Sequence, residues 1–205
     1  SWKETCIMKS NYILLKLNKK NEIRANVDIT ISSLGLIDLK DIDVKIDTGC
    51  PYTSIPIKKL GISSEKIANW KLKDINDNNI KKQISFGVND TEEQKEQYRE
   101  MLKQGEFDNL PAVTFLHHGL TMNFGGIEVK KDTVKVSYDR TGNILIGMDI
   151  MKDWDIHIGT ISTGETIFLA CPKDQLNDEY YMKLNKLFGI GDSIITAESF
   201  KSTNN

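Results

Sequence analysis

Residues Val44–Pro56 read VKIDTGCPYTSIP, an apolar run that ends on an acid, a hydroxyl and a glycine before apolar residues return. Alternating apolar side chains over Leu34–Ile46 predict a β-strand that leads into this segment. Gly49 has no Cβ, so the backbone can turn tightly directly after the acid. The segment therefore predicts a strand that presents Asp47 on a tight loop.

This loop resembles the active-site loop of retropepsin-like aspartic peptidases, of the bacterial type with a single motif and an insertion. In that family, two apolar strand residues precede Asp-Thr/Ser-Gly, and a small residue, two variable positions and a Thr or Ser follow. The resemblance implies that Asp47 is the catalytic carboxylate. It implies loop-supporting roles for Thr48, Gly49, Cys50 and Thr53, with the Thr48 hydroxyl bonding across a dimer axis.

A second segment, Ile144–Ile150 (ILIGMDI), resembles the apolar-apolar-Gly signature that precedes a short helix in the family. In relatives this glycine, here Gly147, lets its strand pass close behind the catalytic loop. Gly147 lies 100 residues after Asp47, farther than in compact retroviral members. An insertion is therefore expected at about residues 61–111. Within it we expect Thr91–Gln104 to form an exposed helix on the flap that closes over substrate.

Four positions near the two segments need an interpretation. Retroviral members carry an acid and an arginine where this chain has Pro51 and Met148, so we expect other contacts to hold the subunit interface. Cys50 is interpreted as a packing residue, with a nucleophilic thiol as the alternative. Asp149 is interpreted as the N-cap of the short helix, with a second catalytic acid as the alternative.

The number of catalytic motifs predicts the assembly. Asp-Thr/Ser-Gly occurs once, whereas this mechanism needs two carboxylates that share one proton. The sequence therefore predicts a C2 homodimer that acts as an aspartic endopeptidase on peptides or proteins, with no metal and no organic cofactor. The alternatives are a non-catalytic dimeric peptide-binding module of the same fold, and an enzyme whose cleft the insertion keeps closed.

The whole chain is predicted to form one domain over residues 1–205. It is expected to be mainly β, a closed barrel-like retropepsin (acid protease) fold with a few short helices and a helical insertion. Alternation on both sides of a polar turn predicts a hairpin over residues 12–31. Short helices are expected at residues 57–60, 64–72 and 149–154, a hairpin around residues 162–164, and a C-terminal helix with a frayed tail at residues 175–205.

The composition of the chain limits the kinds of partner that we expect for it. The chain has 27 Lys and Arg against 29 Asp and Glu and no basic stripe, so nucleic acid is not an expected partner. Lys16 interrupts the longest apolar run, and no membrane span is predicted. Three cysteines without metal-ligand spacing favour reduced thiols and a cytoplasmic location. His117 and His118 are expected on opposite faces of a strand, at solvent or against the flap, and not as joint metal ligands.

Overall fold

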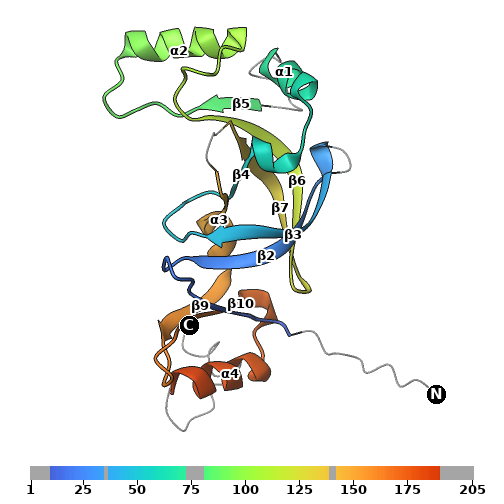
Figure 1. Cartoon of the computed structure of the whole chain (residues 1–205), viewed down its shortest axis with the longest axis vertical. Helices are drawn as coiled ribbons and strands as arrows, with labels where there is room; N and C mark the ends of the chain where they lie inside the picture. The colour runs from blue at the N-terminus through green and yellow to red at the C-terminus, as the bar shows by residue number, and fades with distance from the viewer. Residues whose placement is uncertain (1–9, 35–36, 73–80, 139–141, 190–205) are drawn as a thin grey trace, which may run out of the picture.

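Strands β2 (Ile23–Ile31) and β3 (Ile37–Ile46) form because apolar residues alternate along them, which turns one side of each strand to the core. They pair as antiparallel neighbours, with an irregularity between Val27 and Ile29. The computed structural model describes residues 10–34, 37–72, 81–138 and 142–189 (Figure 1). Within these ranges, β2 and β3 are the first two strands of the main sheet, both along the chain and in the order of the sheet.

The main sheet closes on itself. Its strand order is β2-β3-β8-β4-β7-β6-β5, and β2 also pairs with β6, so all strands but β5 form a closed ring. The remaining strands are β4 (Ser54–Pro56), β5 (Lys81–Ile84), β6 (Val113–Phe124), β7 (Ile127–Ser137) and β8 (Ile144–Ile146). The predicted mainly β, closed barrel-like fold with a few short helices is confirmed.

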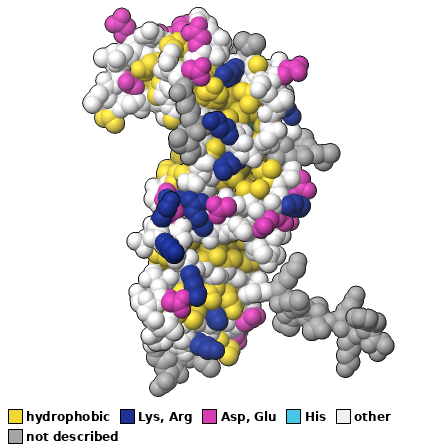
Figure 2. All heavy atoms as spheres, viewed as in Figure 1, with side chains coloured by type: hydrophobic (Ala, Val, Ile, Leu, Met, Phe, Trp, Pro, Cys, Tyr) yellow, Lys and Arg dark blue, Asp and Glu magenta, His cyan; other side chains and the backbone are white. Residues whose placement is uncertain are grey.

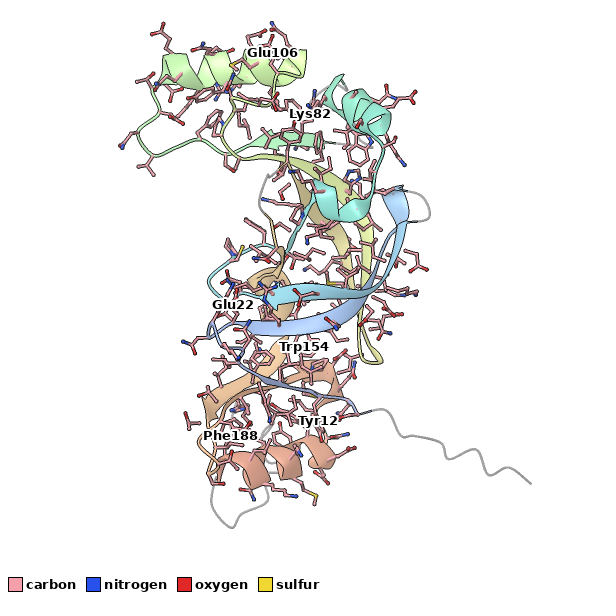
Figure 3. The ribbon with its side chains drawn as sticks, in the orientation of Figure 1. Tyr12, Glu22, Lys82, Glu106, Trp154 and Phe188 are labelled. Atoms are coloured by element: carbon pink, nitrogen blue, oxygen red, sulfur yellow. The ribbon has the colours of Figure 1, made fainter. Side chains whose placement is uncertain are left out.

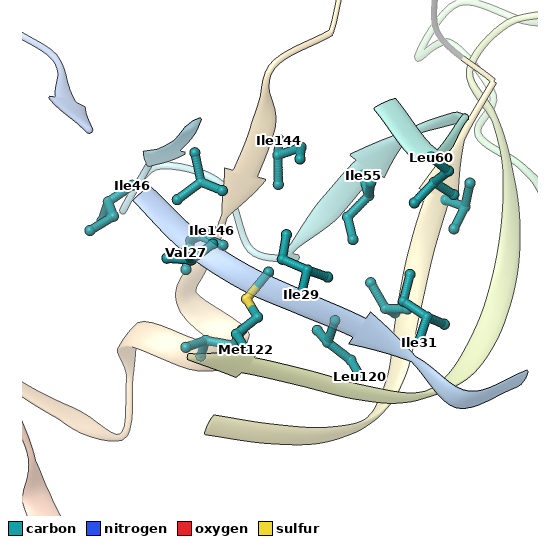
Figure 4. Packing of buried hydrophobic residues seen from close by; sticks show 14 of the residues in the cluster. Val27, Ile29, Ile31, Ile46, Ile55, Leu60, Leu120, Met122, Ile144 and Ile146 are labelled. Carbon is teal, nitrogen blue, oxygen red and sulfur yellow. The ribbon is translucent and has the colours of Figure 1, made fainter. Parts of the chain in front are cut away.

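Aliphatic side chains fill the barrel. Figure 4 shows them converging from opposite strands, and each is at most 3% exposed: Val27, Ile29, Ile31, Ile46, Ile55, Leu120, Met122, Ile144 and Ile146. Removal of apolar surface from water contributes about 25 cal/mol per Å², so this cluster is the main stabilising element. The interior is packed, and groups available for chemistry lie on the outside of the barrel.

A second, smaller sheet has the order β1-β10-β9. It consists of β1 (Ile13–Lys16), β9 (Trp154–Thr160) and β10 (Thr166–Pro172). The predicted hairpin of residues 12–31 is wrong, because β1 pairs with β10. The polar turn does form, with the Asn18 N–H donating to the Glu22 carbonyl at 3.0 Å. Ile13 and Leu15 nevertheless pack against the main core beside β10, and this burial decides the pairing.

The C-terminal helix covers this smaller sheet. Helix α4 (Asp178–Phe188) begins at Asn177, whose side chain accepts a hydrogen bond from the Tyr180 N–H. Its apolar face forms a second buried cluster with β10: Leu169, Cys171, Tyr180, Tyr181 and Leu184. The predicted C-terminal helix and the hairpin around residues 162–164 are both present. The predicted frayed tail lies beyond residue 189, outside the described residues.

Between β4 and β6 the chain leaves the barrel. This segment contains η2 (Ile57–Leu60), α1 (Ser64–Leu72), β5 and α2 (Glu92–Gln104). Thr91 caps α2 by a reciprocal pair of hydrogen bonds with Gln94, and Gly105 ends it with φ at 75°. The helix expected from sequence is therefore present with its predicted ends, and Figure 1 shows it at one end of the molecule, above β5.

Helix α2 is bound to the rest of the fold at its C-terminal end. Leu102 is fully buried in the main core. Lys82 on β5 is also buried, and its Nζ donates to the carbonyls of Lys71 (2.7 Å) and Leu102 (3.4 Å). One ammonium thus binds carbonyls in the last turns of both α1 and α2, where a cation is favourable (Figure 3). The expectation of a wholly exposed helix is wrong at this end.

Three short helical turns complete the described fold. They are η1 (Ser32–Leu34), α3 (Met148–Met151) and η3 (Lys173–Gln175). The predicted helix at residues 149–154 is present but shorter, and Trp154 begins β9. None of the helices in the described ranges is both long and apolar enough for a membrane crossing.

Candidate functional site

Asp47 follows directly on β3. Its N–H donates to the Ile146 carbonyl at 2.9 Å, so the β3–β8 ladder extends to the acid. The Cys50 N–H donates to the Asp47 carbonyl at 3.1 Å, which closes a tight turn. The Gly49 N–H donates to Asp47 Oδ1 at 3.0 Å, and a Cβ on Gly49 would lie 3.3 Å from that oxygen. The backbone therefore orients one carboxylate oxygen and leaves little room for a larger residue.

The tip of this loop is open to solvent in the single chain. Asp47 is half-buried, while Thr48 and Gly49 are exposed. Among the described residues, no ion pair reaches Asp47 and no group donates to its Oδ2. The site thus holds one oriented carboxylate with a free oxygen, and a second carboxylate beside it is not supplied by the described part of this chain.

Gly147 lies directly behind the loop, as the resemblance implied. A Cβ on Gly147 would lie 2.6 Å from the Tyr52 carbonyl carbon and 2.7 Å from the Cys50 carbonyl oxygen. The N–H groups of Met148 and Asp149 donate to the carbonyls of Cys50 (2.8 Å) and Pro51 (3.1 Å). Only glycine permits the backbone at position 147 to approach the loop this closely. The resulting hydrogen bonds tie the start of α3 to the loop.

Asp149 braces the same loop through Thr53. Asp149 Oδ1 accepts hydrogen bonds from the Thr53 N–H (2.9 Å) and from Thr53 Oγ1 (2.7 Å). Thr53 Oγ1 in turn accepts from the Gly147 N–H at 3.1 Å. The interpretation of Asp149 as an N-cap is wrong, because Gly147 is the N-cap of α3 and no side chain caps it. Its carboxylate instead satisfies the buried polar atoms of Thr53.

Cys50 has a contact within the loop. Its Sγ donates to the Tyr52 carbonyl at 3.1 Å, and the side chain is half-buried. Cys50 and Cys171 are both free thiols. In the described ranges no histidine contacts Cys50, and no group of His, Cys, Asp and Glu has the arrangement of a metal site. A packing role for Cys50 fits these contacts.

The two adjacent histidines have opposite environments. His118 is exposed, whereas His117 is fully buried and lies 3.1 Å from the Ser33 hydroxyl through Nδ1. The expectation that both face solvent or the flap is therefore wrong for His117. Burial, with smaller contributions from His118 and Lys66, lowers the pKa of His117 to about 4. This histidine is a neutral, buried residue at neutral pH.

Charged side chains beside the loop were not singled out from sequence. The Lys135 ammonium lies 3.9 Å from the centroid of the Tyr52 ring, which is 53% exposed. Lys45, two residues before Asp47, pairs with Glu22 at 3.4 Å. The sequence could have indicated both lysines, because each lies between two apolar residues of a strand. Alternation along the strand turns those neighbours inward and the lysine to the outer face.

Glu22 forms ion pairs with two of the cations near the loop. It pairs with Arg24 (3.2 Å) as well as Lys45, and Figure 3 shows it beside β2 and β3. Hydrogen bonds from Asn18 and then Arg24 lower the pKa of Glu22 to about 2. Glu22 therefore stays ionised under acid conditions that would protonate an ordinary glutamate.

No protein-family model and no curated protein sequence matches this chain. Among solved structures, the chain is similar to a retropepsin-like aspartic protease from Rickettsia conorii. The TM-score is 0.39 and the identity 14%, over 78% of this chain and 92% of that one.

Proposed function

We propose that the protein is an aspartic endopeptidase whose catalytic pair consists of Asp47 and Asp47 of the partner subunit in a C2 homodimer. The supporting observation is the structure of the loop. Hydrogen bonds to β8 and α3 hold its backbone, and the Asp47 carboxylate at its surface keeps one oxygen free. Such rigid support is what a catalytic carboxylate requires. The exposed Thr48 and Gly49 leave the loop tip free to meet its symmetry mate.

The chemistry follows from bringing two such loops together. Two carboxylates about 3 Å apart cannot both ionise easily, so they share one proton. The ionised acid accepts a proton from water, which attacks the peptide carbonyl, while the protonated acid donates to the carbonyl oxygen. The tetrahedral intermediate then returns that proton to the second acid as its C–N bond breaks, and the leaving amine takes the proton that the first acid had accepted from water. The proposed residues need no cofactor for this cycle. Each chain supplies one half of the acid–base pair.

Asp47→Asn tests this proposal directly. The amide has the shape of the acid and can still accept from the Gly49 N–H, but it cannot exchange the shared proton. We expect cleavage of a peptide library, read by mass spectrometry, to fall about 100-fold or more. Folding and self-association should change little.

The matched control is Asp41→Asn. Asp41 is an exposed residue of β3 with φ at 51°, a conformation that asparagine tolerates. This variant should keep full activity. Residual cleavage by Asp47→Asn within about tenfold of wild type would exclude the acid–base pair. Peptide binding without cleavage by the wild type would instead favour the non-catalytic peptide-binding module.

A further inference from the structure

A row of outward-facing side chains crosses the sheet beside Asp47. The register aligns Lys45 on β3 with Leu145 on β8, Leu145 with Ser54 on β4, and Ser54 with Lys135 on β7. The neighbours of Lys45, Leu145 and Lys135 along their own strands are all inside the barrel, at most 3% exposed. The four aligned residues are all half-buried and lie on the outer face.

Asp47 shares this face. It is two residues beyond Lys45, and its N–H continues the β3–β8 ladder, so both side chains project from the same side of the strand. Two strand residues span about 7 Å and neighbouring strands about 5 Å. By these spacings Lys45 and Leu145 lie within about 10 Å of the catalytic carboxylate, and Ser54 lies about 12 Å from it. A peptide held at Asp47 would lie along this row.

The row is cationic. The register continues to Arg24 on β2 at one end and to Lys81 on β5 at the other, and none of the aligned residues is an acid. Figure 2 shows Lys and Arg side chains spread from the upper part of the viewed face to its lower end, with some Asp and Glu side chains among them. The chain as a whole has a net charge of −2, so this concentration of positive charge is local.

Carboxylates neutralise only part of the row. Arg24 and Lys45 share Glu22, and Arg24 also pairs with the exposed Asp43. In the described part of the chain, no carboxylate pairs with Lys135, whose ammonium lies over the Tyr52 ring beside the catalytic loop. An aromatic face holds a cation without cancelling its charge. Lys135 is thus positioned to receive an anionic group from outside the chain.

We propose that this row selects extended peptides with an acidic side chain within about three residues of the scissile bond, with Lys135 as the main contact and Lys45 as the second. An extended peptide advances about 3.3 Å per residue, so such a side chain is within reach of either lysine. Leu145 between them offers an apolar contact for the stem of that side chain. The proposal rests on the proposed peptidase function and names its substrate class.

Binding tests the selectivity apart from catalysis. Asp47→Asn protein is titrated with two fluorescent pools of degenerate ten-residue peptides, one with a central Glu and one with a central Gln. We expect the Glu pool to bind about fivefold more tightly in low salt and the difference to shrink in 0.5 M salt. Lys135→Gln should reduce the difference, and Lys135→Gln combined with Lys45→Gln should abolish it. Lys130→Gln, an exposed lysine of the same strand paired with Glu128, should keep it.

Cleavage by the wild type separates the two proposals. If cleavage depends on Asp47 but acidic residues are not enriched near the cut bond, the proposed selectivity is wrong and the proposed peptidase function stands. If the protein prefers the Glu pool but cleaves no peptide, the proposed binding of acidic peptides stands and the proposed peptidase function is wrong. Equal affinity for the two pools, or binding of neither, overturns the selectivity. A preference that survives Lys135→Gln and Lys45→Gln together also rejects the row as its source.

Discussion

Two aspartates near the loop, Asp47 and Asp149, differ in what surrounds their oxygens. Asp47 accepts one backbone hydrogen bond and has a free oxygen, whereas Asp149 accepts two hydrogen bonds from the buried Thr53. The first arrangement leaves a carboxylate available for proton exchange. The second uses a carboxylate to satisfy buried donors. The sequence showed both acids beside their glycines, but only the contacts distinguish their roles.

Substitution of Asp149 tests this distinction. In Asp149→Asn the amide oxygen can accept both bonds from Thr53, so activity and stability should stay close to wild type. Asp149→Ala leaves the Thr53 N–H and hydroxyl without their acceptor and should lower the free energy of unfolding by about 2–3 kcal/mol. Urea unfolding and peptide cleavage of both variants provide the measurement. Loss of cleavage in a stably folded Asp149→Asn protein would make Asp149 a catalytic acid.

His117 should make the fold sensitive to acid. Burial lowers its pKa to about 4 in the folded state from about 6.5, so between these pH values the unfolded chain binds more protons. The free energy of unfolding should therefore fall as pH decreases through this window, by about 3 kcal/mol from this residue. Urea unfolding at several pH values should show a shallower fall for His117→Asn. His118→Asn, the exposed neighbour, should keep the wild-type slope, and equal slopes for all three proteins would contradict the prediction.

At the scale of elements, prediction succeeded where local pattern and tertiary burial agree. Strand β3, the loop at Asp47, strand β8 and the capped helix α2 follow from alternation, glycine and capping residues that act within a few positions. Strand β1 was assigned to the wrong partner, because its apolar side chains pack beside β10, about 150 residues later. Strand β5 was missed, since only its pairing with β6 makes this short polar segment a strand.

Helix α2 stands next to a loop that carries an exposed apolar tip. The Phe86 ring lies under Arg99 and Lys95 of α2, at 5.2 Å and 5.9 Å from its centroid. Val88, two residues further, is fully exposed. Figure 1 shows the segment between β5 and α2 projecting to the same side of the molecule as the loop after β3. We propose residues 85–90 as the flap, with α2 holding its base.

Two substitutions separate the flap from the core. Phe86→Ala removes the ring that joins this loop to α2, so kcat or KM for peptides should change while the melting temperature moves little. Leu102→Ala opens a cavity in the main core and should cost about 2–5 kcal/mol of stability. Replacing all of residues 91–104 would mix the two effects, because Leu102 belongs to the core. Unchanged kinetics in Phe86→Ala would place the flap elsewhere.

At the scale of the whole molecule, the described surface around the loop suits a second copy. Tyr52 and Met148 flank the loop and are 53% and 36% exposed. In the proposed dimer, they and Pro51 would supply apolar contact area at positions where retroviral members carry an acid and an arginine. An interface held by apolar burial depends little on salt. Activity should therefore persist in high salt, apart from any loss in binding of acidic peptides.

Dilution tests the assembly. In the proposed dimer each chain supplies one carboxylate, so specific activity should fall when the protein is diluted below the dissociation constant of that dimer. Sedimentation over the same concentrations should show dimer and activity disappearing together. Full specific activity in a species that sediments as a monomer would reject the shared pair.

Mixing wild-type and Asp47→Asn chains gives a sharper version of this test. If both chains exchange freely, an equimolar mixture contains about one quarter wild-type dimers and one half mixed dimers. A mixed dimer has one carboxylate facing an amide, so it cannot share the proton and should be inactive. Activity should then drop to about half of that shown by the same amount of wild-type protein alone. Asp41→Asn chains, mixed in the same way, should cause no loss. Undiminished activity with Asp47→Asn, after exchange is verified by mass spectrometry, would show that each chain works alone.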